Sequence, residues 1–497
     1  MKSIYIKIVA LAVIFTSSCT QDWLELQPRG QLLETNFYQN EEQIFQGLVA
    51  AYDVLNWGGT EGWTMKLGLL NAASDDTYAG GSDASDQPSW VAYDAFTLDP
   101  FLGPQKGLWN KGYTGIYRAN LVLQKLDEVE GLSEEFIART SAEAKFLRAF
   151  YYFDLVRFFE NIPLINTVLS ADAIYEQVQA DPALVYARIE LDLREAINTI
   201  ELPQTVPANE LGRVTQGAAK ALLGKVILFQ NDQSRMGECA VILEEVINSL
   251  IYDLEVDYAN IFSNDNEYGI ESVFEISNSG AARAGWESFA NGSEGNYNVQ
   301  FFGMRDYVGP DYATGWSFCP VTEDLNDFLI SDPRYLHTII DATNIQGASF
   351  TPAYQNTNLF IKKYAPVASE QALDGEVALN WSKNIREIRF ADVLLMAAEA
   401  RVRNGEDSEG RVYLNRVRQR VSLQPVTGLS GDALLNFIYD ERRRELATEG
   451  HRFFDLVRTR QASDVLPNFQ AGKHERLPIP QFEIDITEGN LKQNSGY

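Results

Sequence analysis

Apolar residues recur at helical spacing in two blocks of the chain, residues 37–250 and 385–460. Steps of three and four residues place apolar side chains on one helical face, so each block is expected to form amphipathic helices. The pattern is most regular over residues 136–159, where a long helix is predicted to end before Pro163. Thr215 is a suitable N-cap for a further helix that begins just after it.

Three helices are predicted in the second block, over residues 385–403, 409–420 and 431–448. The helix pair at residues 390–421 is close in length to the unit of about 34 residues that forms a tetratricopeptide-type repeat. The signature residues of that repeat are not clean here, so this interpretation rests on helix length and pairing. The predicted fold class is mainly α, a tetratricopeptide-like helical scaffold.

Two long irregular stretches, residues 56–104 and 253–381, interrupt the helical pattern. The first is rich in Gly, Asp, Ser and Trp and is predicted to form long loops. The second carries short strand-like pieces, such as residues 271–276, between Gly, Asn, Asp and Pro. Binding residues collect on loops that a rigid scaffold holds in place. We therefore expect a single domain over residues 37–497, with its ligand site in these two insertions.

The chain starts with the layout of a bacterial secretory signal. A basic start precedes an apolar stretch, residues 8–15, and small polar residues then lead to Cys19. We predict a signal peptide over residues 1–18, lipid attachment at Cys19, and a polar leader over residues 19–36 that spaces the body from the membrane. The apolar stretch is too short to span a bilayer, which takes about 20 residues.

Composition and charge narrow the classes of ligand. The 497-residue chain is 45% apolar and 12% aromatic, which is typical of an ordered globular protein, and its formal charge is -28. Such an acidic chain is unsuited to nucleic acid, whose phosphates require basic patches. It is equally unsuited to holding acidic polysaccharides through bulk charge. The simplest interpretation of the charge is solubility at a cell surface.

Thiol and imidazole groups do not follow the spacing of a metal site. If Cys19 carries lipid, Cys239 and Cys319 remain, and we expect two lone buried thiols, with one disulfide as the alternative. The three histidines are far apart, so no zinc site, no haem site and no cofactor are expected. Residues 265–269 only loosely resemble a calcium loop, because Ile276 stands where a glutamate ligand belongs. A structural calcium elsewhere is left open.

The motifs of common enzymes are incomplete in this sequence. Residues 80–84 fall short of a G-x-S-x-G elbow because Ala84 replaces the last glycine. Gly224 and Lys225 are followed by Val226 where a phosphate-binding loop has Ser or Thr. A glycoside hydrolase needs two carboxylates, which the 69 acidic residues supply by chance, so that signal carries no information. The protein is expected not to be an enzyme.

Several motifs follow one another in a fixed order along the predicted mature chain. They are Cys19–Pro28, Trp109 with Ile116–Asn120, Ala142–Arg157, Gly212–Thr215, Ile388–Ala400, Asn415 with Val417 and Arg418, Glu445–Arg458, Leu477–Pro480 and Gln493–Tyr497. As an ordered set, they resemble the SusD/RagB family of Bacteroidetes outer-membrane lipoproteins. The resemblance covers nearly all of the mature chain.

The resemblance implies a tetratricopeptide-like scaffold with an irregular ligand-binding region. It also implies a surface-exposed outer-membrane lipoprotein that captures nutrients, usually glycans, without catalysis. The implied partner is a SusC-like, TonB-dependent outer-membrane transporter that receives the ligand. Part of the family takes up oligopeptides, so RagB-type oligopeptide capture is the alternative. A secreted hydrolase is a third hypothesis, from a different class of protein.

Most residues in the matched motifs belong to the scaffold. We expect their charged residues to form ion pairs that lock helices together, and not a catalytic set. These residues are Glu143, Arg148, Asp154, Arg157, Arg444, Glu445 and Glu449.

A site for neutral sugars needs flat aromatic surfaces, with amide, carboxylate or guanidinium groups to bind the hydroxyls. The predicted ligand contacts are Trp57, Trp63, Tyr78 and Trp90 in the first insertion, and Trp286, Asn296, Arg305, Tyr307 and Trp316 in the second. Trp90, Trp286 and Trp316 are flanked by Gly, Ser and Asp, which favours exposed positions. For each aromatic residue the alternative is packing in the core. Asp75 and Asp76 are expected to be loop-capping or scaffold acids.

Overall fold

The computed structural model describes residues 37–59, 62–287 and 293–497. The predicted signal peptide, the leader and the lipidation site at Cys19 therefore lie outside the described residues. Helices dominate the described part and the strands are few and short, which confirms the mainly α fold class. Within these ranges, no helix combines the length and the apolar character needed to cross a membrane.

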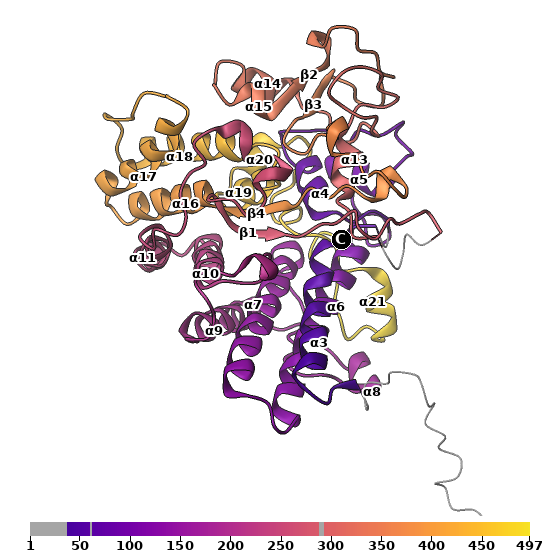
Figure 1. Cartoon of the computed structure of the whole chain (residues 1–497), viewed down its shortest axis with the longest axis vertical. Helices are drawn as coiled ribbons and strands as arrows, with labels where there is room; N and C mark the ends of the chain where they lie inside the picture. Colours follow the sequence, from indigo (N-terminus) through magenta and orange to yellow (C-terminus); the bar gives the residue numbers. More distant parts are fainter. Residues whose placement is uncertain (1–36, 60–61, 288–292) are drawn as a thin grey trace, which may run out of the picture.

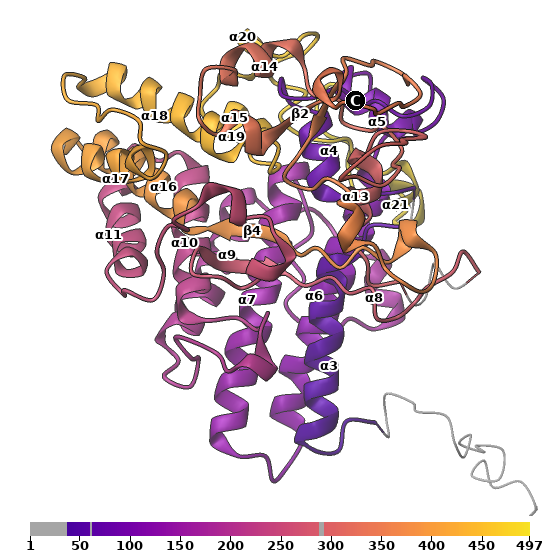
Figure 2. The same cartoon turned by 45° about the horizontal axis from the view of Figure 1, so that its top comes forward.

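The helical scaffold is a curved stack of long helices (Figures 1 and 2). Its members are α3 (Glu41–Asp53), α6 (Gln105–Glu128), α7 (Glu134–Phe159), α9 (Pro182–Asn198), α10 (Gln216–Gln230), α11 (Met236–Ile247), α16 (Phe390–Arg403), α17 (Asp407–Arg420) and α18 (Gly431–Leu446). Helix α6 packs on α3 and α7, α9 on α7 and α10, α11 on α10 and α16, and α16 on α17 and α18. Neighbouring helices from both sequence blocks thus build the expected tetratricopeptide-like scaffold.

Local sequence explains where the long helices begin. The Ser133 side chain accepts a hydrogen bond from the Phe136 N–H and caps α7, the helix predicted over residues 136–159. Thr215 caps α10 in the same way through the Ala218 N–H, as predicted. Each cap satisfies a backbone N–H that would otherwise lack a partner in the first turn of its helix.

The remaining elements are short, and many lie in the two insertions. They are α4 (Lys66–Ala72), α5 (Pro88–Asp94), α8 (Ala171–Tyr175), α13 (Tyr297–Phe302), α14 (Glu323–Leu329), α15 (Tyr335–Thr338), α19 (Arg452–Arg458), α20 (Ala462–Val465) and α21 (Gln481–Ile486), with strands β1 (Ser272–Ile276), β2 (Ile339–Asp341), β3 (Leu359–Ile361) and β4 (Ile385–Arg389). Helices α4 and α5 fall within residues 56–104, where only loops were predicted. Each spans about two turns, which is too short for apolar periodicity to reveal.

The helix predicted over residues 385–403 is wrong in its first five residues. Ile385–Arg389 form strand β4, which pairs antiparallel with β1 and leads directly into α16. The partner strand is distant in the sequence, and strand formation depends on such neighbours more than on local preference. The strand predicted over residues 271–276 is confirmed as β1.

Two lone buried thiols were expected and are confirmed. Cys239 and Cys319 are both free and fully buried. Burial raises the pKa of Cys239 to about 12, and it also raises the pKa of Cys319. Both side chains therefore act as small apolar core residues.

A buried network of ion pairs fastens β4 and the second insertion to the scaffold. Arg389, at the end of β4, donates to Glu449 at 2.7 Å and to Glu445 at 3.0 Å, and it also bonds Glu271. Arg334 reaches Glu445 at 3.0 Å from the insertion side. Burial alone would raise the pKa of Glu445, but the surrounding guanidinium groups hold it well below its usual range.

The prediction that motif charges form scaffold ion pairs is confirmed, although some partners differ. Arg148 forms a bidentate ion pair with Asp192, a residue of α9 that the motifs did not include. Arg444 does not pair with Glu445 as expected, and its guanidinium instead lies 3.9 Å from the Glu441 carboxylate. A helical spacing reveals neighbours on the same helix, whereas the stronger bonds here cross between elements.

Candidate ligand-binding site

Backbone pairing between residues 77–81 and 317–321 joins the two insertions. The Gly81 N–H donates to the Ser317 carbonyl oxygen at 2.9 Å. At Gly80 the segments come so close that a Cβ atom would lie 2.4 Å from the same oxygen, so the position requires glycine. The pairing brings aromatic side chains of both insertions to one surface.

Three tryptophans form an aromatic platform at this junction. The rings of Trp286 and Trp316 are nearly parallel, with an interplanar angle of 19° and a centroid distance of 6.2 Å. The ring of Trp63 stands across that of Trp316, at 77° and 5.7 Å. Trp286 is 51% exposed, and the other two side chains are half-buried. We call these three residues the tryptophan platform.

A polar wall borders the platform across an open depression of about 310 Å³. Asp86 Oδ2 accepts hydrogen bonds from the N–H and the hydroxyl of Ser82, both at 2.8 Å. Arg305 Nη2 lies 3.4 Å from the same oxygen and donates to the Trp316 carbonyl at 3.3 Å. Gln87 also lines the depression. The depression thus has an aromatic floor and a hydrogen-bonding wall in which the Arg305 and Asp86 charges balance.

Three residues at or beside the platform have unusual backbone conformations. Trp63, Ser317 and Cys319 adopt left-handed φ values of 61°, 58° and 52°, a region that bulky residues rarely enter. Such conformations cost on the order of 1–3 kcal/mol each and cluster at binding sites.

The structure brings together four of the nine predicted contacts: Trp63, Trp286, Arg305 and Trp316. For these four, contact with a ligand stays a prediction. Sequence reasoning missed Ser82, Asp86 and Gln87, because polar loop residues without a motif give no signal. The adjacent Gly80–Gly81 pair was the one available sign of a tight backbone approach.

Three predicted contacts are wrong, because their side chains are buried. Trp90 is 0% exposed and packs against Phe301 beneath the platform. Asn296 is 2% exposed, and its side chain caps α13. The Tyr307 hydroxyl donates to the Pro310 carbonyl at 2.7 Å within a small separate core cluster. None of the three can present a face to a ligand.

Two further predicted contacts lie away from the depression. The Tyr78 hydroxyl is 3.5 Å from the Glu323 carboxylate. Trp57 donates through its indole N–H to Asp53 at 3.0 Å, and the Arg118 guanidinium lies over its ring at 4.8 Å. Trp57 lines an internal cavity instead of the platform.

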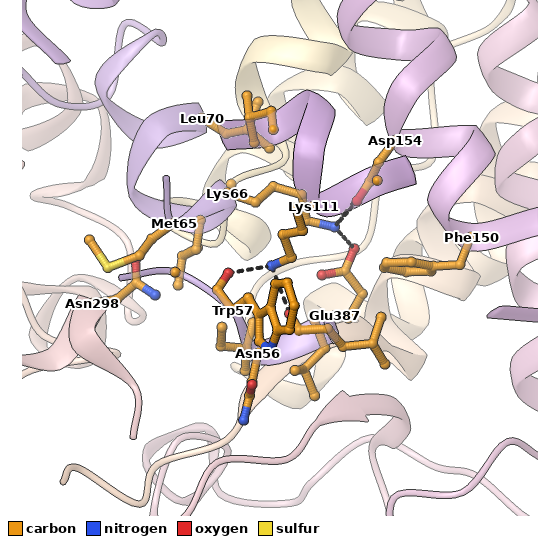
Figure 3. Close-up of a pocket in the computed structure, with 18 of the residues that line it drawn as sticks. Asn56, Trp57, Met65, Lys66, Leu70, Lys111, Phe150, Asp154, Asn298 and Glu387 are labelled. Atoms are coloured by element: carbon orange, nitrogen blue, oxygen red, sulfur yellow. Dashed lines mark hydrogen bonds and ion pairs between the residues drawn. The ribbon is translucent and has the colours of Figure 1, made fainter. Parts of the chain in front are cut away.

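That internal cavity lies between α4, α6, α7 and β4 and has a volume of about 60 Å³ (Figure 3). The Lys66 ammonium binds Asp154 at 3.0 Å and Glu387 at 2.8 Å. Lys111 instead donates to two backbone carbonyls, those of residues 55 and 57, at 2.9 and 2.7 Å. Burial, together with the charge of Lys66, lowers the pKa of Lys111 to about 8. The space suits a few ordered waters, which need roughly 10–15 Å³ each.

His451, at the edge of this cavity, makes stability depend on pH. Its Nδ1 lies 3.3 Å from the Lys225 ammonium, and burial together with that charge lowers its pKa to about 3. Below pH 6.5 the unfolded chain gains a proton that the folded chain does not, so stability falls as pH falls. Replacing His451 with Gln should remove this term, which amounts to about 2 kcal/mol between pH 7 and pH 5.

Urea unfolding of the wild type and His451→Gln at pH 7, 6 and 5 measures this effect. The stability of the wild type relative to the variant is expected to decrease with each step. Ion-paired carboxylates such as Asp392 also make the folded protein less stable in acid, but the wild type and the variant both contain them. A constant difference across this pH range would contradict a neutral buried His451.

The acidic residues near the site are engaged in ion pairs. Asp75 bonds Arg452 at 2.8 Å and Asp76 bonds Arg443 at 2.9 Å, which confirms their predicted role as scaffold acids. Across residues 37–59, 62–287 and 293–497, no group of three or more His, Cys, Asp or Glu could hold a metal ion. The side chains at the platform supply stacking surfaces and hydrogen-bonding groups.

Two family profiles match the chain. The one described as "SusD family" matches residues 270–497, and the one described as "Starch-binding associating with outer membrane" matches residues 22–228. A solved structure of a laminarin binding SusD-like protein is 40% identical, with 93% of this chain and 100% of that chain covered and a TM-score of 0.86. This chain belongs to the SusD family.

Other relatives of this SusD-family protein match over a similar length. Surface glycan-binding protein A from Bacteroides thetaiotaomicron, solved in complex with laminarihexaose, is 30% identical over 92% of this chain and 100% of that chain, with a TM-score of 0.83. A SusD-like protein of Formosa agariphila is 26% identical, with 99% of each chain covered. The similarity of this SusD-family chain to the solved structures therefore extends over the whole architecture and is not limited to one motif.

Proposed function

We propose that this SusD-family protein captures a neutral glucan of the laminarin type at the tryptophan platform, without catalysis. The observation that carries the proposal is the platform itself, three tryptophans beside a hydrogen-bonding wall in an open depression. Its support from relatives is the 40% identical laminarin binding protein.

The platform has the chemistry that a β-linked glucan requires. Glucose residues carry equatorial hydroxyls, so both ring faces present C–H groups that stack on indole rings. The hydroxyls around the ring edge need donors and acceptors, which Arg305, Asp86 and Gln87 supply. Because Arg305 and Asp86 pair with each other, the wall carries no excess charge and suits a neutral ligand. The open shape accepts the interior of a chain as well as an end.

We further propose that Cys19 carries the lipid that anchors the protein in the outer membrane, exposed at the cell surface. In this position it would deliver glucan to a SusC-like, TonB-dependent transporter. Support comes from the secretory layout before Cys19, and from the matched family description, which names association with the outer membrane. In this proposal, the leader over residues 19–36 spans the distance between the lipid at Cys19 and the folded domain.

The proposal is tested by affinity electrophoresis of the mature chain, with Cys19→Ser to prevent acylation. Laminarin is expected to retard the protein, whereas pectic acid and other acidic polysaccharides leave its mobility unchanged. In the native host, full-length protein should fractionate with the outer membrane and co-purify with the transporter, and Cys19→Ala should release it. Retardation by no glycan, together with binding of oligopeptides, would replace the proposal with RagB-type peptide capture.

A further inference from the structure

We propose that an open groove on the helical scaffold, away from the platform, docks a partner polypeptide through a segment that combines apolar side chains with a Lys or Arg. The groove lies between α6, residues 163–177 and α21, and its volume is about 470 Å³. The described residues that line this scaffold groove do not line the depression at the platform. The inference therefore does not depend on the proposed glucan binding.

Helix α6 carries more apolar surface than its packing in the scaffold requires. It packs on α3 and α7, and its Gly112 and Gly115 lie directly against α7. A further side of the same helix presents Tyr113, Ile116 and Tyr117 to the scaffold groove. Both views place α8 and α21 along that side of α6 (Figures 1 and 2). A helix that packs on one layer of neighbours needs a single apolar face, so the additional face indicates a further contact.

Exposed apolar side chains continue from the scaffold groove onto the short helices beside it. Ile174 of α8 lines the groove and is 49% exposed. Tyr175 and Phe482 are each more than half exposed at the two ends. The Asn490 side chain donates to the Tyr175 carbonyl at 3.0 Å, which holds the segment after α21 against α8. A contiguous apolar surface of this kind is typical of protein interaction sites.

Charge at the scaffold groove calls for a basic partner. Glu483 alone is charged among the described residues that line it. Burial raises the pKa of this carboxyl group, the Lys106 charge opposes the shift, and no hydrogen bond from the described residues reaches it. A partly desolvated carboxylate in this state gains from a cation that binding supplies. The bordering residues 170–178 and 481–492 contain five acidic residues and one basic residue, namely Asp172, Glu176, Glu483, Asp485, Glu488 and Lys492.

The lining favours a polypeptide over a glycan or a membrane. Trp109 is 4% exposed and packs on Tyr113 and Phe159, so it offers no open flat face for a sugar. The Tyr113 hydroxyl already donates to the Pro163 carbonyl at 2.9 Å. Aliphatic side chains make up much of the remaining lining: Ile116, Ile165, Leu169, Ile174, Ile486 and Leu491. Such sockets suit the apolar face of an amphipathic segment, whereas the acidic border repels anionic lipid headgroups.

Two synthetic amphipathic peptides of about 15 residues test the inference by calorimetry with the mature chain carrying Cys19→Ser. They share one face of Leu and Ile, and the polar positions are Lys in one peptide and Glu in the other. The Lys peptide is expected to bind at least about tenfold more tightly than the Glu peptide. Glu483→Gln should lower the affinity for the Lys peptide at least about threefold. Ile174→Asp should lower it at least about tenfold, because it places a charge among the apolar lining.

A matched variant separates docking in the scaffold groove from general attraction between a basic peptide and an acidic protein. Val412 on α17 is 64% exposed and does not line the groove. Val412→Asp adds the same charge as Ile174→Asp, and the affinity for the Lys peptide should stay within about twofold of the wild type. Both positions are exposed in the folded protein, so neither substitution is expected to unfold it.

Several results would overturn the inference. They are binding of neither peptide, equal binding of both, or the same affinity of Ile174→Asp and Val412→Asp for the Lys peptide. Flotation with phosphatidylcholine vesicles that Ile174→Asp abolishes would assign the scaffold groove to a lipid surface. A dimer in analytical ultracentrifugation that Ile174→Asp dissociates would assign it to a second copy of the chain. Laminarihexaose should bind Ile174→Asp as it binds the wild type, so a failure of docking and a failure of glucan capture are distinct results.

Discussion

Replacing Trp316 with alanine is expected to lower the affinity for laminarihexaose by at least about thirtyfold, which corresponds to about 2 kcal/mol. Trp316 is the central ring of the platform and contacts both Trp286 and Trp63. Its removal takes away one stacking surface and leaves the other two unsupported. Isothermal titration calorimetry of the mature protein with laminarihexaose measures the loss.

The control for this prediction keeps the ring and changes its size. Trp316→Phe should retain a large part of the affinity, because a smaller aromatic face still spans the two neighbouring rings. Thermal unfolding should show all variants folded, since Trp316 is half-buried and Phe301 and Phe318 remain beneath it. Unchanged affinity in Trp316→Ala would mean that glucan binds elsewhere on the protein.

Replacing Arg389 with methionine is expected to reduce the free energy of unfolding by about 3–5 kcal/mol. Arg389 is 1% exposed and lies between Glu271, Glu445 and Glu449. Methionine fills similar space but leaves these buried carboxylates without their shared guanidinium. Each carboxylate keeps another cation, Arg420 for Glu271 and Glu445 and Lys363 for Glu449, but the buried cluster loses one positive charge. Removing one partner from a buried ion pair costs far more than the net gain from the original pair. Urea unfolding at neutral pH measures the difference.

A matched surface pair provides the control for Arg389. Lys220 binds Glu245 at 2.8 Å, and the Glu245 side chain is 52% exposed, so Lys220→Met should cost less than about 1 kcal/mol. Arg389→Lys keeps the charge but loses the two-pronged geometry and should lie between the wild type and Arg389→Met. Equal effects of Arg389→Met and Lys220→Met would show that the buried network contributes nothing beyond surface pairing.

The long helices could be predicted from the sequence, because each carries its own signal. Helix α7 has a regular apolar face, a capping serine and a proline just beyond its end, and all three cues are local. Strand β4 could not be predicted in this way. Its partner β1 comes from a distant part of the chain, and a five-residue strand directly before a helix continues the apolar pattern of that helix.

The candidate site was only partly predictable, because composition does not reveal which side of a loop a ring occupies. Trp90 and Trp316 have similar sequence surroundings, yet one is fully buried and the other lines the depression. What separates them is tertiary packing, above all the space that Gly68 leaves for the Trp90 ring. The polar wall depends on the same pairing between insertions, so residues such as Asp86 acquire their role only in the folded chain.

The pairing of residues 77–81 with residues 317–321 also bears on how ligand preference can change between relatives. The two insertions that these segments join each supply part of the surface, so a new preference on one insertion needs a matching change on the other. Exchange of a single loop between two relatives would join two unrelated surfaces, whereas exchange of both would carry the preference with them. The helices outside the two insertions need not change at all, so one scaffold can serve many glycans through paired replacement.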